Sequence, residues 1–196
     1  MPTIRAVRRR HSQSWAARPA DFVLAAARRI AEHGSLRWAA WELIRFHRPA
    51  FAALDDETLF ELAVGLDSWD SVDAFARTLS GPAWAQGRMT DALVDRWSAS
   101  PDRWLRRAAL VSTVALNRPK EGGRVDAPRT LAVCERLVED RDDMVVKALS
   151  WALRELGRPD PASVRAFIQR HGTRLAARVR REVGNKLHTG LKNPRR

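Results

Sequence analysis

Residues that could do chemistry are concentrated in the segment 67–73, which reads Asp-Ser-Trp-Asp-Ser-Val-Asp. If this segment is helical, Trp69, Asp73 and Arg77 lie on one stripe at positions i, i+4 and i+8. A neighbouring stripe of apolar side chains can then face the core, so Trp69 is not needed for burial. An aromatic ring one turn from a carboxylate can stabilise a cation, and the net charge of +12 attracts anions. The segment therefore predicts a site that attracts an anionic molecule and stabilises positive charge on it.

Two further segments combine aromatic and cationic side chains. In the segment 142–155, Lys147, Trp151 and Arg154 share a helical stripe that is separate from the apolar one. A ring between two cations suits a sugar-phosphate backbone, with the cations on phosphates and the ring against a sugar or base. The segment 101–108 places three arginines along one exposed edge: Arg103, Arg106 and Arg107.

Each of these patterns also has a purely structural interpretation. A tryptophan in a helix usually packs in the core, and this is the interpretation that we favour for Trp15, Trp38, Trp41, Trp84 and Trp97. Asp73 could be no more than the i,i+4 partner of Arg77, and a row of arginines is often a solvated face. For Trp69 and Trp151 the packing and functional interpretations have equal weight.

Standard catalytic patterns are absent from the sequence. The five histidines show no metal-ligand spacing, and there is neither a phosphate-binding glycine loop nor a Gly-x-Ser-x-Gly elbow. The single cysteine, Cys134, excludes an internal disulfide and a cysteine-based zinc cluster. If the chain is an enzyme, we expect its chemistry to use Asp, Trp and Arg without a metal or a cofactor.

Composition favours one globular domain that binds nucleic acid. With 196 residues, of which 45% are hydrophobic, the chain can build a sizeable core. Its 35 Lys and Arg outnumber its 23 Asp and Glu, and only four of these cations are lysines. Arginine suits bidentate phosphate contacts, so nucleic acid is the leading partner. No apolar run is long enough for a membrane span and no secretory signal is visible, so we expect a cytoplasmic protein.

The elements that must position these residues are predicted to be helices throughout. Apolar residues recur at spacings of three and four, and no segment alternates as a strand does. Helices are predicted over Asp21–Gly34, Leu36–His47, Asp55–Leu62, a stretch from Trp69 to a break at Gly81-Pro82, Met89–Trp97, Ser100–Leu116, Leu131–Val138, Asp142–Leu156, Asp160–Ile168 and Leu175–Leu187. The segment 118–123 is predicted to be a loop.

Successive helices with short connections favour stacked antiparallel pairs. We therefore predict an all-α fold, a curved α-solenoid, with a compact orthogonal bundle as the alternative. Residues 1–20 are expected to form a basic N-terminal arm, and residues 21–196 a single helical-repeat domain. The segment 51–80 is acidic whereas both ends are basic. Phosphates could thus bind at the flanks and leave the central carboxylates for chemistry.

Four motifs resemble one known family. The motifs are Ser-Trp-Asp-Ser-Val-Asp at 68–73, Arg-Trp-Leu-Arg-Arg-Ala-Ala at 103–109, Lys-Ala-Leu-Ser-Trp-Ala-Leu-Arg-Glu at 147–155, and Arg-Arg-Glu at 180–182. From about Leu36 to the C-terminus they resemble, in matching order, the DNA alkylation repair family of DNA glycosylases built from HEAT-like helical repeats. The segment before Leu36 matches this family weakly.

The resemblance implies a concave, basic groove on a HEAT-like α-solenoid that removes N3- and N7-alkylated purines from duplex DNA. It places the catalytic carboxylate at Asp73, the groove tryptophans at Trp69 and Trp151, and an arginine that grips the DNA backbone at Arg107. The family contacts the backbone around the lesion and leaves the base largely unflipped. Further DNA-binding residues are expected at Arg103, Arg106, Lys147, Arg154, Arg180, Arg181 and Lys186.

The complete prediction is a monofunctional glycosylase that leaves an abasic site. We expect it to act as a monomer associated with the nucleoid, with no cofactor and no membrane contact. The chain has no tyrosine, so an N-terminal aromatic contact would have to come from Trp15, Trp38 or Trp41. Two alternatives remain open at this point: a non-catalytic DNA-binding scaffold and a HEAT-like protein-interaction module.

Overall fold

The computed structural model describes residues 4–194, which contain helices and no strand. In chain order the α-helices are α1 Ile4–Ser14, α2 Ala20–Ala31, α3 Arg37–Phe46, α4 Arg48–Ala52, α5 Asp56–Ala63, α6 Trp69–Phe75, α7 Gly81–Ala85, α8 Asp91–Ser98, α9 Arg103–Leu116, α10 Ala127–Arg136, α11 Asp143–Leu156, α12 Pro161–His171 and α13 Ala177–Thr189. A π-helical turn, Ala76–Ser80, joins α6 to α7, and 3₁₀ turns lie at Gly34–Leu36 and Pro119–Glu121. The predicted all-helical class is confirmed.

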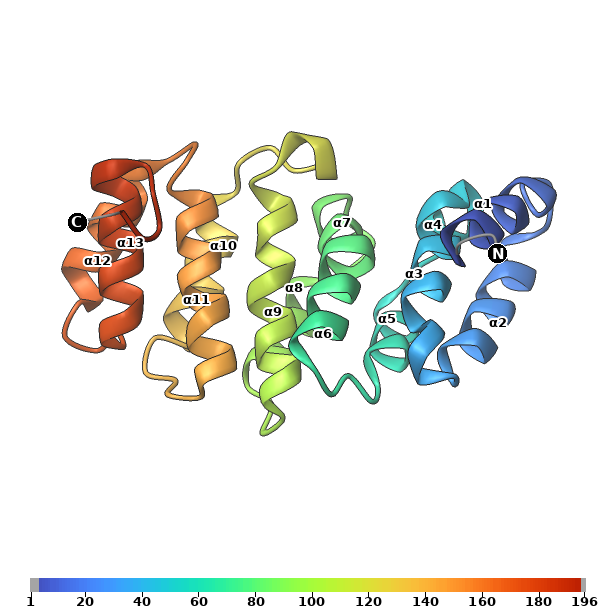
Figure 1. Ribbon diagram of the computed structural model, residues 1–196, viewed down its shortest axis with the longest axis horizontal. Helices are drawn as coiled ribbons and strands as arrows, with labels where there is room; N and C mark the ends of the chain where they lie inside the picture. Colours follow the sequence, from blue (N-terminus) through green and yellow to red (C-terminus); the bar gives the residue numbers. More distant parts are fainter. Residues whose placement is uncertain (1–3, 195–196) are drawn as a thin grey trace.

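The helices lie side by side in a row, with the two ends of the chain at opposite ends of the molecule (Figure 1). One layer of the row contains α2, α3, α6, α9, α11 and α13, and neighbours in this layer contact one another. Behind it lie α8, α10 and α12, which pack against α9 and α11. This order brings α6, α9 and α11 together, the three helices that carry the motifs around residues 69, 107 and 151.

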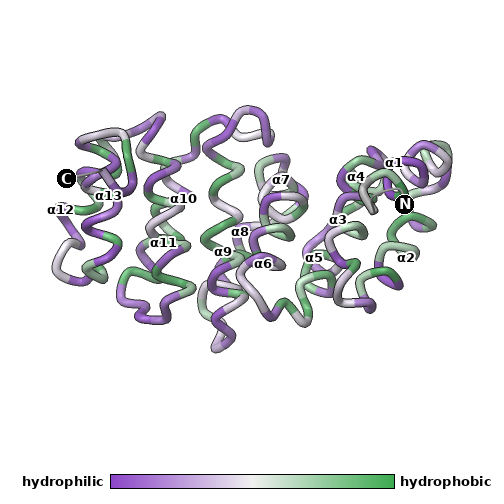
Figure 2. Tube along the Cα trace, in the orientation of Figure 1, coloured by the Kyte–Doolittle hydropathy of each residue, from purple (hydrophilic) through white to green (hydrophobic). Residues whose placement is uncertain are grey.

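The core lies between the two layers, and hydrophobic stretches recur along each helix (Figure 2). The rings of Trp41, Phe75 and Trp97 pack at steep angles to one another within it, with ring centroids 5.3 Å and 6.0 Å apart for successive pairs. Trp41, Trp84 and Trp97 are buried, which confirms their predicted packing role. Many helices begin at a residue whose side-chain oxygen accepts a backbone N–H bond, including Asp55, Thr90, Asp102, Asp126, Asp142 and Asp160.

The chain does not break at Gly81-Pro82, and this part of the prediction is wrong. Helical backbone continues from α6 through the π turn into α7, and Gly81 has right-handed helical angles (φ −62°, ψ −52°). A proline in an α-helix lacks an N–H donor and clashes with the carbonyl four residues earlier. A wider π turn just before Pro82 relieves that clash, so the helix bulges rather than ends.

The N-terminal segment contains α1, which packs against α3. Arg8 of this helix donates to Glu42 at 2.8 Å and lies over the ring of Phe46. The expected basic arm thus includes a docked helix, and residues 1–3 of that arm lie outside the described residues. Within residues 4–194, no helix is both long enough and apolar enough to cross a membrane.

Several helix boundaries also differ from the prediction. The helix of Trp97 begins at Asp91, so the buried Met89 precedes it, and α9 begins after Asp102 rather than after Ser100. The short helix α4 was not predicted; it begins after His47, whose ring accepts the Ala50 N–H bond. The loop after α9 is confirmed and contains only a 3₁₀ turn.

Candidate active site

A cleft of about 960 Å³ opens beside α3 and α6 and reaches Trp151 of α11. Its lining contains all three positions of the predicted stripe, Trp69, Asp73 and Arg77. The cleft therefore brings together residues from the first and third motifs, although about 80 residues of sequence separate Trp69 from Trp151.

The first turn and the buried face of α6 together direct Asp73 and Trp69 toward the cleft. Ser68 precedes the helix with extended angles, and its N–H donates to the Ser71 hydroxyl at 3.3 Å. Val72 and Phe75 are fully buried against the core. With that face turned inward, the helical period directs the stripe of Trp69 and Asp73 toward the cleft.

Asp73 is held by a buried arginine from α9. The Arg107 Nε donates to Asp73 Oδ1 at 3.0 Å, and its Nη2 donates to Oδ2 at 2.9 Å. The Arg107 Nη1 donates to the Met144 carbonyl at the start of α11. Only 6% of the Arg107 side chain is exposed, against 18% for Asp73. The two-point contact fixes both the position and the plane of the carboxylate.

Burial and charge act on Asp73 in opposite directions. Burial raises the pKa of Asp73 above its ordinary value, because removal from water penalises the ionised form. The guanidinium of Arg107, and more weakly that of Arg77, stabilise the carboxylate and oppose this shift in its pKa. The ionised carboxylate is therefore poorly hydrated, and a cation that enters the cleft interacts with it strongly.

The two tryptophans flank the cleft in different environments. Trp69 is 57% exposed and is available as a flat apolar surface. Trp151 is half-buried against the core, and its Nε1 donates to Glu155 at 3.3 Å. Arg77 lies with its guanidinium carbon 6.0 Å from the Trp151 ring centre and also donates to Glu121. Arg77 therefore has partners other than the predicted Asp73.

The other predicted cations divide into paired and exposed groups. Arg106 donates to Asp140 at 2.7 Å and to two backbone carbonyls, while Arg103 contacts Asp142 at 3.4 Å and lies over Trp104. Lys147 pairs with Asp143 at 2.7 Å. The two arginines join α9 to the loop between α10 and α11, and the Lys147 pair lies within α11, so the three cations also have a structural role.

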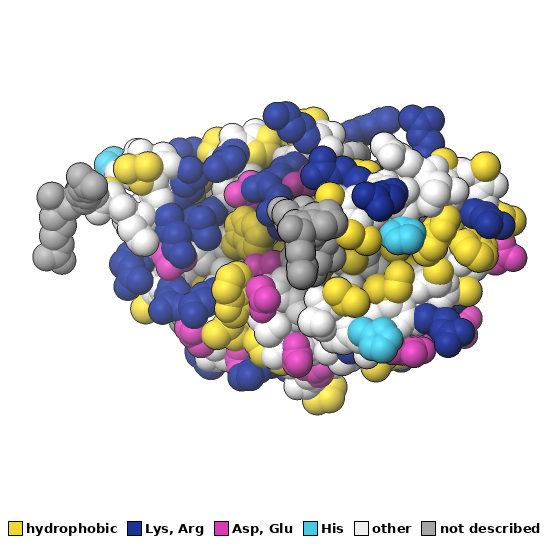
Figure 3. Space-filling model, turned by 45° about the vertical axis from the view of Figure 1, so that its right-hand side comes forward, with side chains coloured by type: hydrophobic (Ala, Val, Ile, Leu, Met, Phe, Trp, Pro, Cys, Tyr) yellow, Lys and Arg dark blue, Asp and Glu magenta, His cyan; other side chains and the backbone are white. Residues whose placement is uncertain are grey.

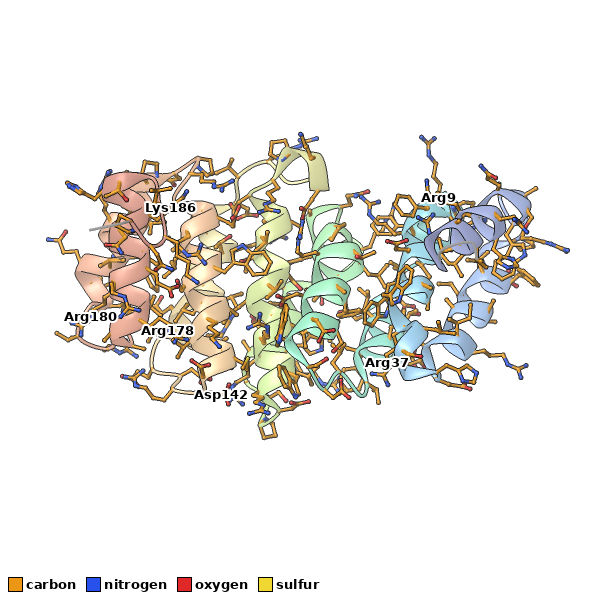
Figure 4. The ribbon with its side chains drawn as sticks, in the orientation of Figure 1. Arg9, Arg37, Asp142, Arg178, Arg180 and Lys186 are labelled. Atoms are coloured by element: carbon orange, nitrogen blue, oxygen red, sulfur yellow. The ribbon has the colours of Figure 1, made fainter. Side chains whose placement is uncertain are left out.

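Cations on the C-terminal helices are less enclosed. Arg180 and Arg181 are exposed on α13, and Lys186 contacts the Gly190 carbonyl beyond them. Figure 4 shows Arg180 and Arg178 at one end of α13 and Lys186 near the other end. Arg154 is half-buried and donates to the Ser150 hydroxyl at 3.3 Å. In Figure 3, Lys and Arg side chains form a group on the left of the view and also lie along its top and right, beside acidic and hydrophobic side chains.

The sequence did not single out the part of the cleft contributed by α3. Arg37, Trp38, Trp41 and Glu42 line it, together with the glycine at position 65. Arg37 donates to the carbonyls of Ala31 and Gly65, which ties the turn before α6 to α3 (Figure 4). The only signal in the sequence was that Trp38 and Trp41 were candidates for an N-terminal aromatic contact.

The polar groups of the cleft are carboxylates, guanidiniums, hydroxyls and indole N–H groups. Among residues 4–194, no three His, Cys, Asp or Glu side chains come together as metal ligands would. The arrangement can stabilise positive charge at Asp73 and can orient a water molecule there.

Comparisons with curated proteins and with solved structures find no match. The family model described as DNA alkylation repair enzyme matches residues 1–187 of the 196. The match includes all four motifs and extends across the segment before Leu36, where the motifs themselves gave only a weak resemblance. Because the match covers nearly the whole chain, the protein belongs to the DNA alkylation repair enzyme family.

Proposed function

We propose that this protein is a DNA glycosylase that hydrolyses the N-glycosidic bond of cationic N3- and N7-alkylated purines in duplex DNA. The product is free alkylated base and an abasic site. One observation carries the proposal: the Asp73 carboxylate lines the same cleft as the indoles of Trp69 and Trp151 and is held in place by Arg107. Family membership supports a role in DNA alkylation repair.

The chemistry suits a site without a strong general acid. An alkylated purine already carries positive charge, so it departs as a neutral base when it takes the electron pair of the bond to C1′. Positive charge then develops on the sugar, as in other glycoside hydrolyses. Water adds to C1′ and loses a proton to solvent. A fixed carboxylate at Asp73 stabilises the cationic sugar in the transition state and orients the attacking water.

The indoles of Trp69 and Trp151 add a second source of stabilisation. Ring faces attract cations through their quadrupole, and the attraction is larger when water is excluded. Both indoles line the cleft; Trp69 is exposed and Trp151 is half-buried. Both rings can contact the cationic base or sugar without a pocket that encloses a flipped base.

Arg107 supports catalysis through Asp73 in this proposal. All three of its contacts are internal and its side chain is 6% exposed. These contacts favour a role in positioning Asp73 over the direct phosphate contact that the family resemblance implied. Phosphates would instead meet the exposed cations of α13 and the half-buried Arg154.

The same proposal extends to the shape of the molecule. We infer that the row of paired helices is a HEAT-like α-solenoid and that the layer containing α6, α9 and α11 forms a concave, basic groove for the duplex. The cleft beside α3 and α6 and the exposed arginines of α13 support the inference.

The proposal is tested with duplex DNA that contains N7-methylguanine. Wild-type protein should release the free base, and Asp73→Asn should slow release by about 100-fold or more, since it removes a preorganised charge. Duplex binding by Asp73→Asn should be retained. Asp95→Asn is the matched control, because Asp95 pairs with Arg136 between α8 and α10 and lies away from the cleft. Equal release by wild type and Asp73→Asn would contradict the proposal.

The second candidate is a non-catalytic DNA-binding scaffold. It is favoured by the two-point ion pair of Asp73, since a carboxylate held in this way also stabilises packing of α6 on α9. A scaffold would bind duplex DNA in a salt-sensitive manner and release no base from any alkylated substrate. Weak binding that ignores Arg154→Ala would instead point to a protein partner.

A further inference from the structure

Five side chains form a closed circuit beside the cleft. Trp151 donates to Glu155 at 3.3 Å, Glu155 accepts from Arg118 at 3.0 Å, and Arg118 donates to Glu121 at 3.2 Å. Glu121 also accepts from Arg77 at 3.3 Å, and the Arg77 guanidinium lies over the Trp151 ring. The circuit therefore begins and ends at the same indole.

The circuit holds Trp151 at two points. Glu155 fixes the edge of the indole through its N–H group, while Arg77 covers a ring face. Glu155 is itself only 8% exposed and has two cationic neighbours, Arg118 at 2.9 Å and Arg158 at 3.9 Å. A buried carboxylate with such partners has little freedom, so the indole that it contacts is restrained as well.

The loop that closes the circuit is firmly attached to the end of α9. A Cβ atom on Gly123 would lie 2.1 Å from the Ala115 carbonyl oxygen, so only glycine fits there. The Gly123 N–H donates to the Arg118 carbonyl at 3.1 Å, and the Val125 N–H to the Leu116 carbonyl at 3.0 Å. Figure 1 shows this loop at the end of α9 that lies beside α7. Arg118 and Glu121 thus have fixed anchor points.

Each guanidinium of the circuit faces a carboxylate. Arg77 pairs with Glu121 beside Trp151, so its positive charge there is compensated. This matters because a cationic base or sugar in the cleft would be repelled by a free guanidinium at the same indole. Glu121 compensates the charge of Arg77 through an ion pair at 3.3 Å.

We propose that Glu155, Arg118 and Glu121 are positioning residues that fix the Trp151 indole and the Arg77 guanidinium at the cleft. The catalytic consequence rests on the proposed function, whereas the restraint on the indole does not. None of the three positioning residues lines the cleft, so they act through Trp151 and Arg77 rather than on DNA.

The test uses protein labelled with 5-fluorotryptophan, with the Trp151 ¹⁹F resonance assigned from Trp151→Phe. Glu155→Leu removes the indole acceptor and the charge, whereas Glu155→Gln retains an acceptor oxygen. Glu121→Leu removes the oxygen that accepts from Arg77 and Arg118, and Glu121 contacts neither the indole nor the cleft. Glu139→Leu is the control, since Glu139 forms an exposed ion pair with Arg174 outside the circuit.

Glu155→Leu and Glu121→Leu should move or broaden the Trp151 resonance beyond any change in Glu139→Leu. Both should slow single-turnover release of N7-methylguanine about tenfold while duplex affinity stays the same, because a misplaced ring loses transition-state contact. Glu155→Gln should recover part of the rate. Circular dichroism checks that each variant is folded, and Glu121→Leu alone decides the result if Glu155→Leu does not fold.

If the Trp151 resonance keeps its chemical shift and line width in the folded variants, the proposal is overturned. A changed resonance with an unchanged rate of base release would also overturn it. If wild-type protein releases no base, the proposed glycosylase function fails by itself. In that case a moved resonance still supports the restraint on Trp151, and an unmoved one still overturns it.

Discussion

Asp73 and Arg107 form the contact on which the candidate site depends most. Burial removes water from the Asp73 carboxylate, so it can interact strongly with a cation. The Arg107 guanidinium fixes its position through two hydrogen bonds. Arg107 bridges α6, α9 and the start of α11, since it also donates to the Met144 carbonyl. A change in this one side chain should therefore alter the orientation of the carboxylate without altering the surface that faces DNA.

Arg107→Lys tests this positioning role. Lysine keeps the charge but cannot make the two parallel N–H contacts, so the carboxylate should rotate and base release should slow about 10-fold to 100-fold. Duplex affinity should stay within a factor of about two. Arg174→Lys, at an exposed pair with Glu139, is the control. A weaker affinity with an unchanged rate for bound DNA would favour the phosphate contact that the family resemblance implied.

The raised pKa of Asp73 predicts an acid limit to activity. Release requires the ionised carboxylate, so the rate should fall as pH decreases through the pKa, which burial places above the ordinary Asp value. Because the folded-state pKa exceeds the unfolded one, protonation of Asp73 itself does not destabilise the fold. Single-turnover rates against pH, with circular dichroism at each pH, would measure the limit. A rate that stays constant down to the ordinary Asp pKa of about 3.9 would contradict it.

Among the elements, the continuous helical run from α6 through α7 sets the position of the cleft. The π turn lets the chain pass Pro82 without a break, and Gly81 then lies directly against α9. A Cβ atom at Gly81 would lie 2.9 Å from both the Ala115 Cβ and the Ser112 carbonyl oxygen. The close approach of the two segments keeps α6, with Asp73, within reach of Arg107.

Gly81→Ala should lower the free energy of unfolding by about 1–3 kcal/mol, because the added methyl group has no space between α7 and α9. Gly184→Ala is the matched control: it lies within α13, is exposed, and has no atom within 4 Å of its ideal Cβ. Gly184→Ala should raise stability by about 0.5–1 kcal/mol, since alanine favours helix. Urea unfolding of both variants measures the effect, and equal stability of Gly81→Ala and wild type would be the contrary result.

At the scale of the whole molecule, the net charge bears on the affinity for DNA, and the position of the cleft bears on where the reaction takes place. The net charge of +12 attracts polyanions over a long range, whereas the cleft lies beside α3 and α6. Exposed arginines on α13 lie toward one end of that row (Figure 4). We expect these arginines to set affinity and the residues around Asp73 to set the rate of reaction.

The affinity for duplex DNA should fall steeply as the salt concentration rises. If Arg180 and Arg181 each contact one phosphate, Arg180→Ala and Arg181→Ala should each reduce the slope of log binding constant against log salt concentration by about 1. Base release from fully bound substrate should not change. Arg136→Ala is the control, because Arg136 pairs with Asp95 between α10 and α8 in the other layer. Identical slopes for the two α13 variants and wild type would place the DNA elsewhere.

The sequence by itself determined the helical class, most helix positions and the residue types of the candidate site, because hydrophobic periodicity and capping are local properties. The family resemblance, carried by short motifs, is confirmed as well. Only the tertiary structure decided that Arg107 lies behind Asp73, that Arg77 contacts Trp151 and Glu121, and that α3 completes the cleft. These contacts join residues more than 30 positions apart. The spacing of side chains along a helix predicts which residues share a face. The residues that this face contacts depend on how the helices pack, and so does the bulge at Pro82.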